Sequence, residues 1–308
     1  MPGWNAHDIP DRSGRVAVVT GANSGLGYVT ARELARKGAR VVLACRSEPR
    51  GAAARDRLVA EVPGALAELR RLDLGDLGSV REFAAAFPYD RLDLLVNNAG
   101  VMALPYGTTV DGFETQFGVN HLGHFALTGL LLPALLGTPG ARVVTVSSPL
   151  HALSNIDLTD LNSERCYRRW LAYARSKTAN LLFTHELARR AGAQGADLVA
   201  AAAHPGYADT NLQSAGPRMA GRRASEWLVR IGNRVLAQSA EAGALPTLYA
   251  ATAPGVRPDC FTGPSVAMWR GSPAPSWRAP WTVNDLAAER LWEASERLTG
   301  VTYGALKV

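Results

Sequence analysis

The hydrophobic pattern alternates between short apolar runs and longer amphipathic stretches. Six apolar runs predict strands, at residues 15–20, 40–45, 68–72, 92–97, 141–147 and 196–203. These runs are apolar throughout, as expected for parallel strands that are covered on both faces. The stretches between and after them predict helices, among them residues 25–37, 76–87, 112–136, 170–190 and 284–298.

Strand–helix alternation of this kind indicates right-handed βαβ units and an open, doubly wound α/β sheet of the Rossmann type, with helices on both faces. The chain of 308 residues shows no internal repeat and no low-complexity linker. We therefore predict one domain over residues 1–308, with a core at 14–265 and a C-terminal extension at 266–308.

Residues 212–238 stand outside this alternation and are rich in arginine. From residue 224 the apolar positions follow helical spacing, so one face is apolar and the other basic. The stretch follows the sixth predicted strand on the ligand-binding side of the sheet, and we predict that it is a mobile lid over the substrate. Two alternatives stay open: a helix packed permanently on the core, and a basic surface that touches a membrane or a partner subunit.

Composition narrows the class of protein. Hydrophobic residues make up 47% of the chain and charged residues 19%, which excludes a disordered or collagen-like chain. No apolar run approaches the ~20 residues of a membrane-spanning helix, and the N-terminus has no apolar stretch of the signal-peptide kind. Three widely spaced cysteines encode neither a disulfide framework nor a metal site. We expect a soluble, cytoplasmic protein with no metal and no integral membrane contact.

The net charge of +6 could indicate a nucleic-acid partner. The positive residues are scattered, however, and only three of them are lysines, so the excess of arginine is better explained by a nucleotide-composition bias. We therefore expect no binding to nucleic acid.

A glycine-rich loop follows the first predicted strand and opens a helix. Its glycines allow a tight turn that brings a pyrophosphate against the helix N-terminus, where free N–H groups and the helix dipole favour anions. The alternative is an ordinary glycine-rich turn, but the strand–loop–helix context is the one that the motif requires. The candidate cofactor residues in the loop are Gly21, Asn23, Ser24, Gly25, Leu26 and Gly27.

The end of the second predicted strand bears on which dinucleotide binds. An NAD-selective site would place an acidic residue here for the ribose hydroxyls, whereas this chain has Arg46, followed by Arg50. A guanidinium can bind a 2′-phosphate through two N–H groups, which favours NADP(H) as cofactor. The alternative is that Arg46 is merely solvated, and the case for Arg50 is weaker.

Tyr173 and Lys177 lie four residues apart, on one face of a predicted helix. A free phenol has a pKa of ~10, and a neighbouring ammonium group would lower that pKa toward the range of an acid–base catalyst. A solvated helix face would show the same spacing. The scarcity of lysine and the serines at 147 and 148, which close the strand upstream, favour the catalytic interpretation.

Together these motifs resemble the short-chain dehydrogenase/reductase family, and within it the retinol-dehydrogenase-like branch. The resemblance extends from residue 14 to about residue 301. The matching motifs are TGANSGLG (20–27), ACR (44–46), LDL (72–74), NNAG (97–100), VNHLGHF (119–125), VSS (146–148), YARSK (173–177), HPG (204–206) with Thr210, and LTGV (298–301).

The resemblance implies a catalytic tetrad of Asn120, Ser148, Tyr173 and Lys177. Tyr173 would be the acid/base, Ser148 would orient the carbonyl, Lys177 would also hold the nicotinamide ribose, and Asn120 would position a water in the proton relay. It implies further cofactor contacts: Asp73 at the adenine, Asn98, Ala99 and Gly100 beside the adenosine ribose, Thr210 near the carboxamide, and Leu74, Pro205 and Gly206.

We therefore expect an NADP(H)-dependent oxidoreductase that transfers a hydride between the nicotinamide and a small carbonyl or alcohol substrate. A non-catalytic NADP(H)-binding redox sensor is the alternative, although such a module would not need Tyr173. An insertion at 156–171 lengthens the segment between Ser148 and Tyr173, and the retinol-dehydrogenase-like branch carries a similar one. We expect His121, His124 and His151 to pack or make polar contacts near the pocket. The sequence does not decide the oligomeric state, and a homodimer is one alternative.

Overall fold

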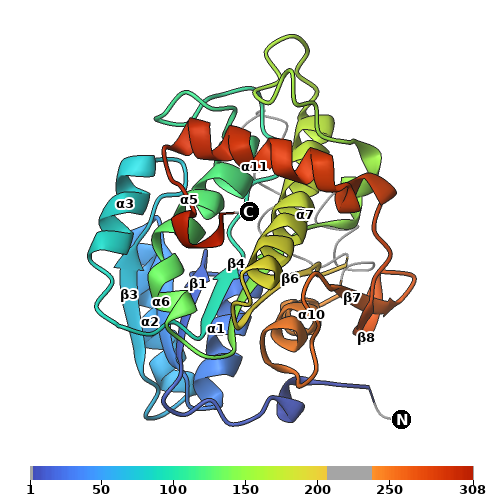
Figure 1. The fold of residues 1–308 in the computed structure, drawn as a ribbon. Coiled ribbons are helices and arrows are strands. Elements are labelled where there is room, and N and C mark those ends of the chain that lie inside the picture. The colour runs from blue at the N-terminus through green and yellow to red at the C-terminus, as the bar shows by residue number, and fades with distance from the viewer. Residues whose placement is uncertain (1–2, 207–237, 308) are drawn as a thin grey trace, which may run out of the picture.

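The computed structural model describes residues 3–206 and 238–307. Within them, eight strands form one sheet in the order β3-β2-β1-β4-β5-β6-β7-β8 (Figure 1). Strands up to β7 pair in parallel, whereas β8 pairs antiparallel to β7. The strands are β1 (Val16–Thr20), β2 (Arg40–Cys45), β3 (Ala67–Arg71), β4 (Leu94–Asn97), β5 (Ala141–Val146), β6 (Leu198–Ala203), β7 (Phe261–Val266) and β8 (Arg270–Pro275).

Helices cover both faces of the sheet. One apolar core lies under α1 (Gly25–Arg36), α2 (Glu48–Glu61) and α10 (Ala240–Thr252). The other lies under α3 (Leu77–Ala85), α5 (Gly123–Leu130) and α7 (Arg169–Ala193), and α11 (Asp285–Thr299) crosses over α5 and α7 (Figure 1). The short elements are η1 (Ala6–Asp8), α4 (Thr115–Phe117), η2 (Gly118–Leu122), α6 (Leu132–Leu136), η3 (Pro149–Leu153), η4 (Pro280–Val283) and η5 (Gly304–Leu306).

This arrangement confirms the predicted doubly wound α/β fold. The central strand β1 is buried at all five positions, because helices cover its two faces, and this explains its unbroken apolar sequence. Strand β3 lies at one edge of the sheet and is only partly buried, so its sequence AELRR is far more polar.

The prediction of one continuous helix over residues 112–136 is wrong. The structure divides it into α4, the π-helical turn η2, α5 and α6. Pro133 explains the last division, because proline has no N–H and is tolerated only in the first turn of a helix, the place it takes in α6. The π-helical turn contains Asn120, so the irregularity falls at a candidate catalytic residue.

The stretch that was expected to be a C-terminal extension contributes to the main fold. It supplies β8, which pairs with β7, and α11, whose Trp292 is 2% exposed and packs edge-on against Phe125 of α5. Thr210 and the predicted lid, apart from Gln238, lie outside the described residues. Across the part of the chain that the structure describes, we find no helix that is long and apolar enough to cross a membrane.

Candidate active site

The glycine-rich loop forms a closely packed turn between β1 and α1. The Gly21 N–H donates to the Ala44 carbonyl of β2 at 2.8 Å. A Cβ at Gly27 would lie 2.5 Å from the Asn98 Nδ2 atom and 2.5 Å from the Gly21 carbonyl oxygen, so only glycine fits there. Ser24, at the N-cap of α1, makes no side-chain capping bond. The N–H groups of the first turn are therefore available to a bound anion.

The loop after β4 is held against this turn by Thr20. The Thr20 hydroxyl accepts hydrogen bonds from the backbone N–H groups of Asn98 and Ala99, both at 2.9 Å. The Asn98 side chain donates to the Thr20 carbonyl at 2.8 Å. Two segments that sequence reasoning assigns to the cofactor are thus fixed side by side.

The two arginines after β2 have different surroundings. Arg46 is exposed directly at the end of the strand. Arg50 is exposed too, but its Nε and Nη2 atoms lie 3.2 Å from the Asn23 side-chain oxygen when that amide is oriented to accept from them. Arg50, the weaker of the two candidates by sequence, therefore lies against the glycine-rich loop.

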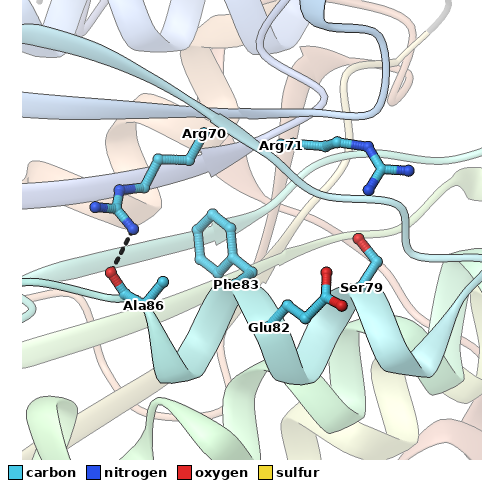
Figure 2. Close-up of a pocket in the computed structure, with 6 residues that line it drawn as sticks. All are labelled: Arg70, Arg71, Ser79, Glu82, Phe83 and Ala86. Carbon is cyan, nitrogen blue, oxygen red and sulfur yellow. Dashed lines mark hydrogen bonds between the residues drawn. The ribbon is translucent and has the colours of Figure 1, made fainter.

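Asp73 and Leu74 follow β3, the edge strand beside β2. The Asp73 carboxylate accepts from the Gly75 N–H at 2.9 Å, and the Asp73 N–H donates to the Ser79 hydroxyl of α3 at 3.0 Å. Leu74 is buried at 7% exposure. A hollow of about 220 Å³ lies next to this turn, between β3 and α3 (Figure 2). Its lining residues are Arg70, Arg71, Ser79, Glu82, Phe83 and Ala86, none of which is a candidate site residue.

Helix α7 carries Tyr173 and Lys177, and contacts with β5 fix its position. The Lys177 Nζ atom donates to the Val146 carbonyl at 3.0 Å and lies 5.8 Å from the centre of the Tyr173 ring. The Ser147 hydroxyl donates to the Lys177 carbonyl at 2.8 Å. The ammonium group is thus held at the end of β5, close to the Tyr173 ring.

Tyr173 has a higher pKa than the sequence spacing predicts. Burial raises the pKa of Tyr173 to about 12, and a hydrogen bond with Ser148 acts in the opposite direction. Burial also lowers the pKa of Lys177 to about 8. The group that lowers the tyrosine pKa here is Ser148, not Lys177 as the spacing predicts, and burial outweighs it because a phenolate is strongly disfavoured away from water.

Asn120 lies on the π-helical turn, and both polar atoms of its side chain are hydrogen-bonded. Its Oδ1 atom accepts from the Val101 N–H at 2.8 Å, and its Nδ2 donates to the Val101 carbonyl and to Ser176 Oγ, each at 2.9 Å. A Cβ at Gly100 would lie 3.1 Å from the Asn120 Oδ1 atom and 3.6 Å from Lys177 Nζ. Asn120 is therefore brought together with Lys177 and the loop after β4.

Sequence reasoning did not predict the partners of Ser176 and His151, which hold the candidate catalytic residues in place. Ser176 Oγ donates to the Tyr173 carbonyl at 2.7 Å and so links Asn120 to α7. His151, which was expected to make polar contacts, has its Nδ1 atom 2.7 Å from the Ser148 carbonyl, and its Nε2 atom accepts from the Ala279 N–H at 3.0 Å. The contact between His151 and Ala279 joins residues that are 128 positions apart in the chain, so no local sequence motif could reveal it.

Pro205 and Gly206 form a turn that is seated on the β7–β8 hairpin. Gly206 has a φ of +66°, and a Cβ there would lie 2.4 Å from the Trp269 carbonyl oxygen. Its N–H donates to the His204 Nδ1 atom at 3.1 Å, and the Gln238 side chain donates to the Pro205 carbonyl. The hairpin therefore fixes the last of the described candidate cofactor residues.

Comparison with known proteins places this arrangement in a family. Residues 15–220 match the family model described as short chain dehydrogenase. The chain belongs to the short-chain dehydrogenase family. It is 42% identical to human Retinol dehydrogenase 12 over 94% of this chain and 88% of that protein, and 41% identical to human Retinol dehydrogenase 13 over 94% and 85%.

Solved structures agree with this membership. A crystal structure of an uncharacterized protein from Mycobacterium paratuberculosis is 47% identical, with a TM-score of 0.82, over 98% of this chain and 99% of that chain. A structure from Beutenbergia cavernae, assigned as an NAD(P)-dependent gluconate 5-dehydrogenase with NADP bound at low occupancy, is 29% identical. Its TM-score is 0.59, over 79% of this chain and 91% of that chain. This short-chain dehydrogenase is a retinol-dehydrogenase-like oxidoreductase of alcohol or carbonyl groups.

Proposed function

We propose that this short-chain dehydrogenase uses NADP(H) and that Tyr173 is its acid/base. The observation that carries the proposal is the convergence of Tyr173, Lys177 and Asn120 beside the loop after β4, which Thr20 holds against the glycine-rich turn. A chain that only bound a nucleotide would not need a buried phenol hydrogen-bonded to a buried serine at this place.

The residues fit a dinucleotide. The close approach at Gly27 and the uncapped start of α1 leave room and donors for a pyrophosphate, as in other Rossmann folds. The residues that would hold it are Gly21, Asn23, Ser24, Gly25, Leu26, Gly27, Arg46, Asp73, Leu74, Asn98, Ala99, Gly100, Tyr173, Lys177, Pro205, Gly206 and Thr210. When bound, the cofactor supplies or accepts the hydride.

Tyr173 would give its phenolic proton to the oxygen of a carbonyl substrate during reduction. A pKa of about 12 keeps the phenol protonated at neutral pH, which suits a proton donor. Ser148 would hydrogen-bond the same substrate oxygen, and Lys177, held on Val146, would place its positive charge beside the phenolate that is left. The reverse reaction requires a deprotonated Tyr173, so we expect reduction to be favoured near pH 7.

The decisive experiment on the chemistry is Tyr173→Phe. This change deletes only the hydroxyl, so the NADPH dissociation constant should stay within about twofold while kcat falls by about 10²–10⁴-fold. Tyr89→Phe is a matched control, because the Tyr89 hydroxyl bonds Glu68 of the edge strand β3. If the Tyr173→Phe variant retained more than about a tenth of the activity, another group would have to supply the proton.

The proposed preference for NADP(H) rests on Arg46 and on Arg50, which lies beside the glycine-rich loop. Their guanidinium groups can bind the 2′-phosphate of NADP(H), whereas an acidic residue at this place would repel it. The NADP in the Beutenbergia cavernae structure is in keeping with this assignment. NADPH should bind at least about tenfold more tightly than NADH, about 1.4 kcal/mol, and Arg46→Asp should remove or reverse the difference. Fluorescence titration measures both affinities, and equal affinities in the unaltered protein would refute the assignment.

The names of the relatives guide the choice of substrate. Because human Retinol dehydrogenases 12 and 13 share 42% and 41% of the aligned positions, retinol and its aldehyde should head a panel of small alcohols, aldehydes and ketones. Turnover of any member with NADP(H) supports an enzyme. Tight NADPH binding without turnover of any member would favour the redox sensor instead.

A further inference from the structure

His124 lies on α5, four residues after Asn120, and is 1% exposed. Its Nδ1 atom is 3.0 Å from the Asn120 carbonyl oxygen, and its Nε2 atom is 2.9 Å from the Thr20 hydroxyl. One ring therefore spans the distance between the catalytic π-helical turn and the end of β1, where the glycine-rich loop begins.

The partners of His124 determine where its proton lies. A carbonyl oxygen can only accept, so Nδ1 carries the hydrogen and donates it to Asn120. Burial lowers the pKa of His124 to about 4, so the ring is neutral and Nε2 is an acceptor. The Thr20 hydroxyl must then donate to Nε2. The two lone pairs of this hydroxyl receive the N–H groups of Asn98 and Ala99, and the other acceptor within reach of its proton, the Val96 carbonyl, is more distant at 3.3 Å than His124 Nε2 at 2.9 Å.

These bonds form one directional chain. The amides of Asn98 and Ala99 donate to Thr20, Thr20 donates to His124, and His124 donates to Asn120. Aligned hydrogen bonds of this kind polarise one another and fix the geometry of the groups at both ends. One end is the loop assigned to the cofactor ribose, and the other is the backbone of the residue assigned to the proton relay.

We propose that His124 is a positioning residue that couples the cofactor loop to the catalytic turn through this hydrogen-bonded chain. The inference rests on the proposed function and deepens it. Without the ring, the Thr20 proton keeps only the Val96 carbonyl, at 3.3 Å, as its acceptor, and the Asn120 carbonyl loses a donor, so both the loop and the turn are less firmly held. A shift of either should weaken cofactor binding and misplace the groups around Tyr173.

His121 provides a matched control, because it is a buried histidine one turn earlier with a different partner. It is 2% exposed, its Nε2 atom is 2.8 Å from Ser295 Oγ of α11, and its ring stacks on Phe117. Replacing it should therefore lower stability without acting on the cofactor loop. A role of His124 in stability alone would make the two histidines behave alike.

The experiment compares His124→Leu with His121→Leu by NADPH titration, kcat and thermal unfolding. We expect His124→Leu to weaken NADPH binding and to lower kcat at least fivefold each, while His121→Leu, which removes a bond to Ser295 rather than one to the cofactor loop, changes NADPH affinity less than twofold despite a similar loss of melting temperature. If NADPH affinity and kcat of His124→Leu stay within twofold of the unaltered protein, the coupling does not exist.

A double-mutant cycle that combines His124→Leu with Thr20→Val tests the hydrogen-bonded chain itself. If His124→Leu does not fold, His124→Gln takes its place in the cycle. If the two residues act as one chain, the double variant should bind NADPH no more weakly than the worse single variant. Multiplication of the two losses would overturn the proposal. The outcome for Tyr173→Phe is independent of this cycle, so the proposed function can stand or fail separately.

Discussion

Lowering the pH from 7 to 5 should destabilise the folded chain through three buried histidines. Burial lowers the pKa of His121 to about 3, of His124 to about 4 and of His204 to about 3. Each ring is hydrogen-bonded in its neutral form, His121 to Ser295, His124 to Thr20 and His204 to Ser276. In the unfolded chain the same rings titrate near pH 6.5.

The sign follows from which state binds more protons. Because the folded pKa values lie below the unfolded value, the unfolded chain takes up protons between pH 6.5 and about pH 4, and the free energy of unfolding falls as the pH falls. At pH 5 each histidine favours the unfolded chain by about 2 kcal/mol, or about 6 kcal/mol for the three. Typical domains have only about 5–15 kcal/mol to lose.

Urea denaturation followed by tryptophan fluorescence at pH 7, 6 and 5 measures this loss. Most carboxylates stay ionised over this window, so the histidines dominate the slope, which should approach about 4 kcal/mol per pH unit between pH 6 and 5. In His121→Leu the slope should be smaller by about a third. A change of less than about 1 kcal/mol between pH 7 and 5 would show that these rings are not held neutral in the folded state.

Two further predictions concern other parts of the molecule. Gly27→Val should abolish NADPH binding, because its side chain would collide with Gly21 and Asn98, whereas Gly192→Ala, with open space around it, should bind normally in the same titration. His185→Leu should lower the free energy of unfolding at pH 6 more than at pH 9. The pKa of His185 is raised, first of all by its hydrogen bond to Asp259. This bond therefore stabilises the folded chain below pH 6.5, and the stabilisation is lost as the pH rises through the folded pKa. Equal losses of unfolding free energy at pH 6 and pH 9 would contradict this prediction.

Local pattern predicts the central part of the fold well. Strands β1, β2, β4, β5 and β6 are nearly continuous apolar runs because helices cover both of their faces. Helix α2 is harder to predict, because only three of its residues are buried and one of them is Gly51, a residue that disfavours helix; a Cβ there would lie 2.4 Å from Leu69. The sequences FTGPSV and RGSPAP of β7 and β8 resemble loops, because proline and glycine are unfavourable in most strands.

The spacing of Tyr173 and Lys177 on one helix face could be predicted, because it depends on helical geometry alone. Their electrostatics could not, since the pKa of Tyr173 depends on burial by the whole fold. The hydrogen-bond partners of Asn120 and His151 could not be predicted either, because those contacts join segments up to 128 residues apart in the chain. Such pairings follow from tertiary packing, which a single sequence does not encode locally.

The two ends of the sheet bear on self-association. An exposed edge strand offers unpaired N–H and C=O groups to any other extended chain and is a common starting point for aggregation. Here one edge is β3, with charged side chains at Glu68, Arg70 and Arg71, and the other is β8, where Pro273 and Pro275 have no N–H to donate. Among the described residues, neither edge is therefore a good template for a further strand, and we expect any association between copies of the chain to use side-chain contacts rather than an extension of the sheet.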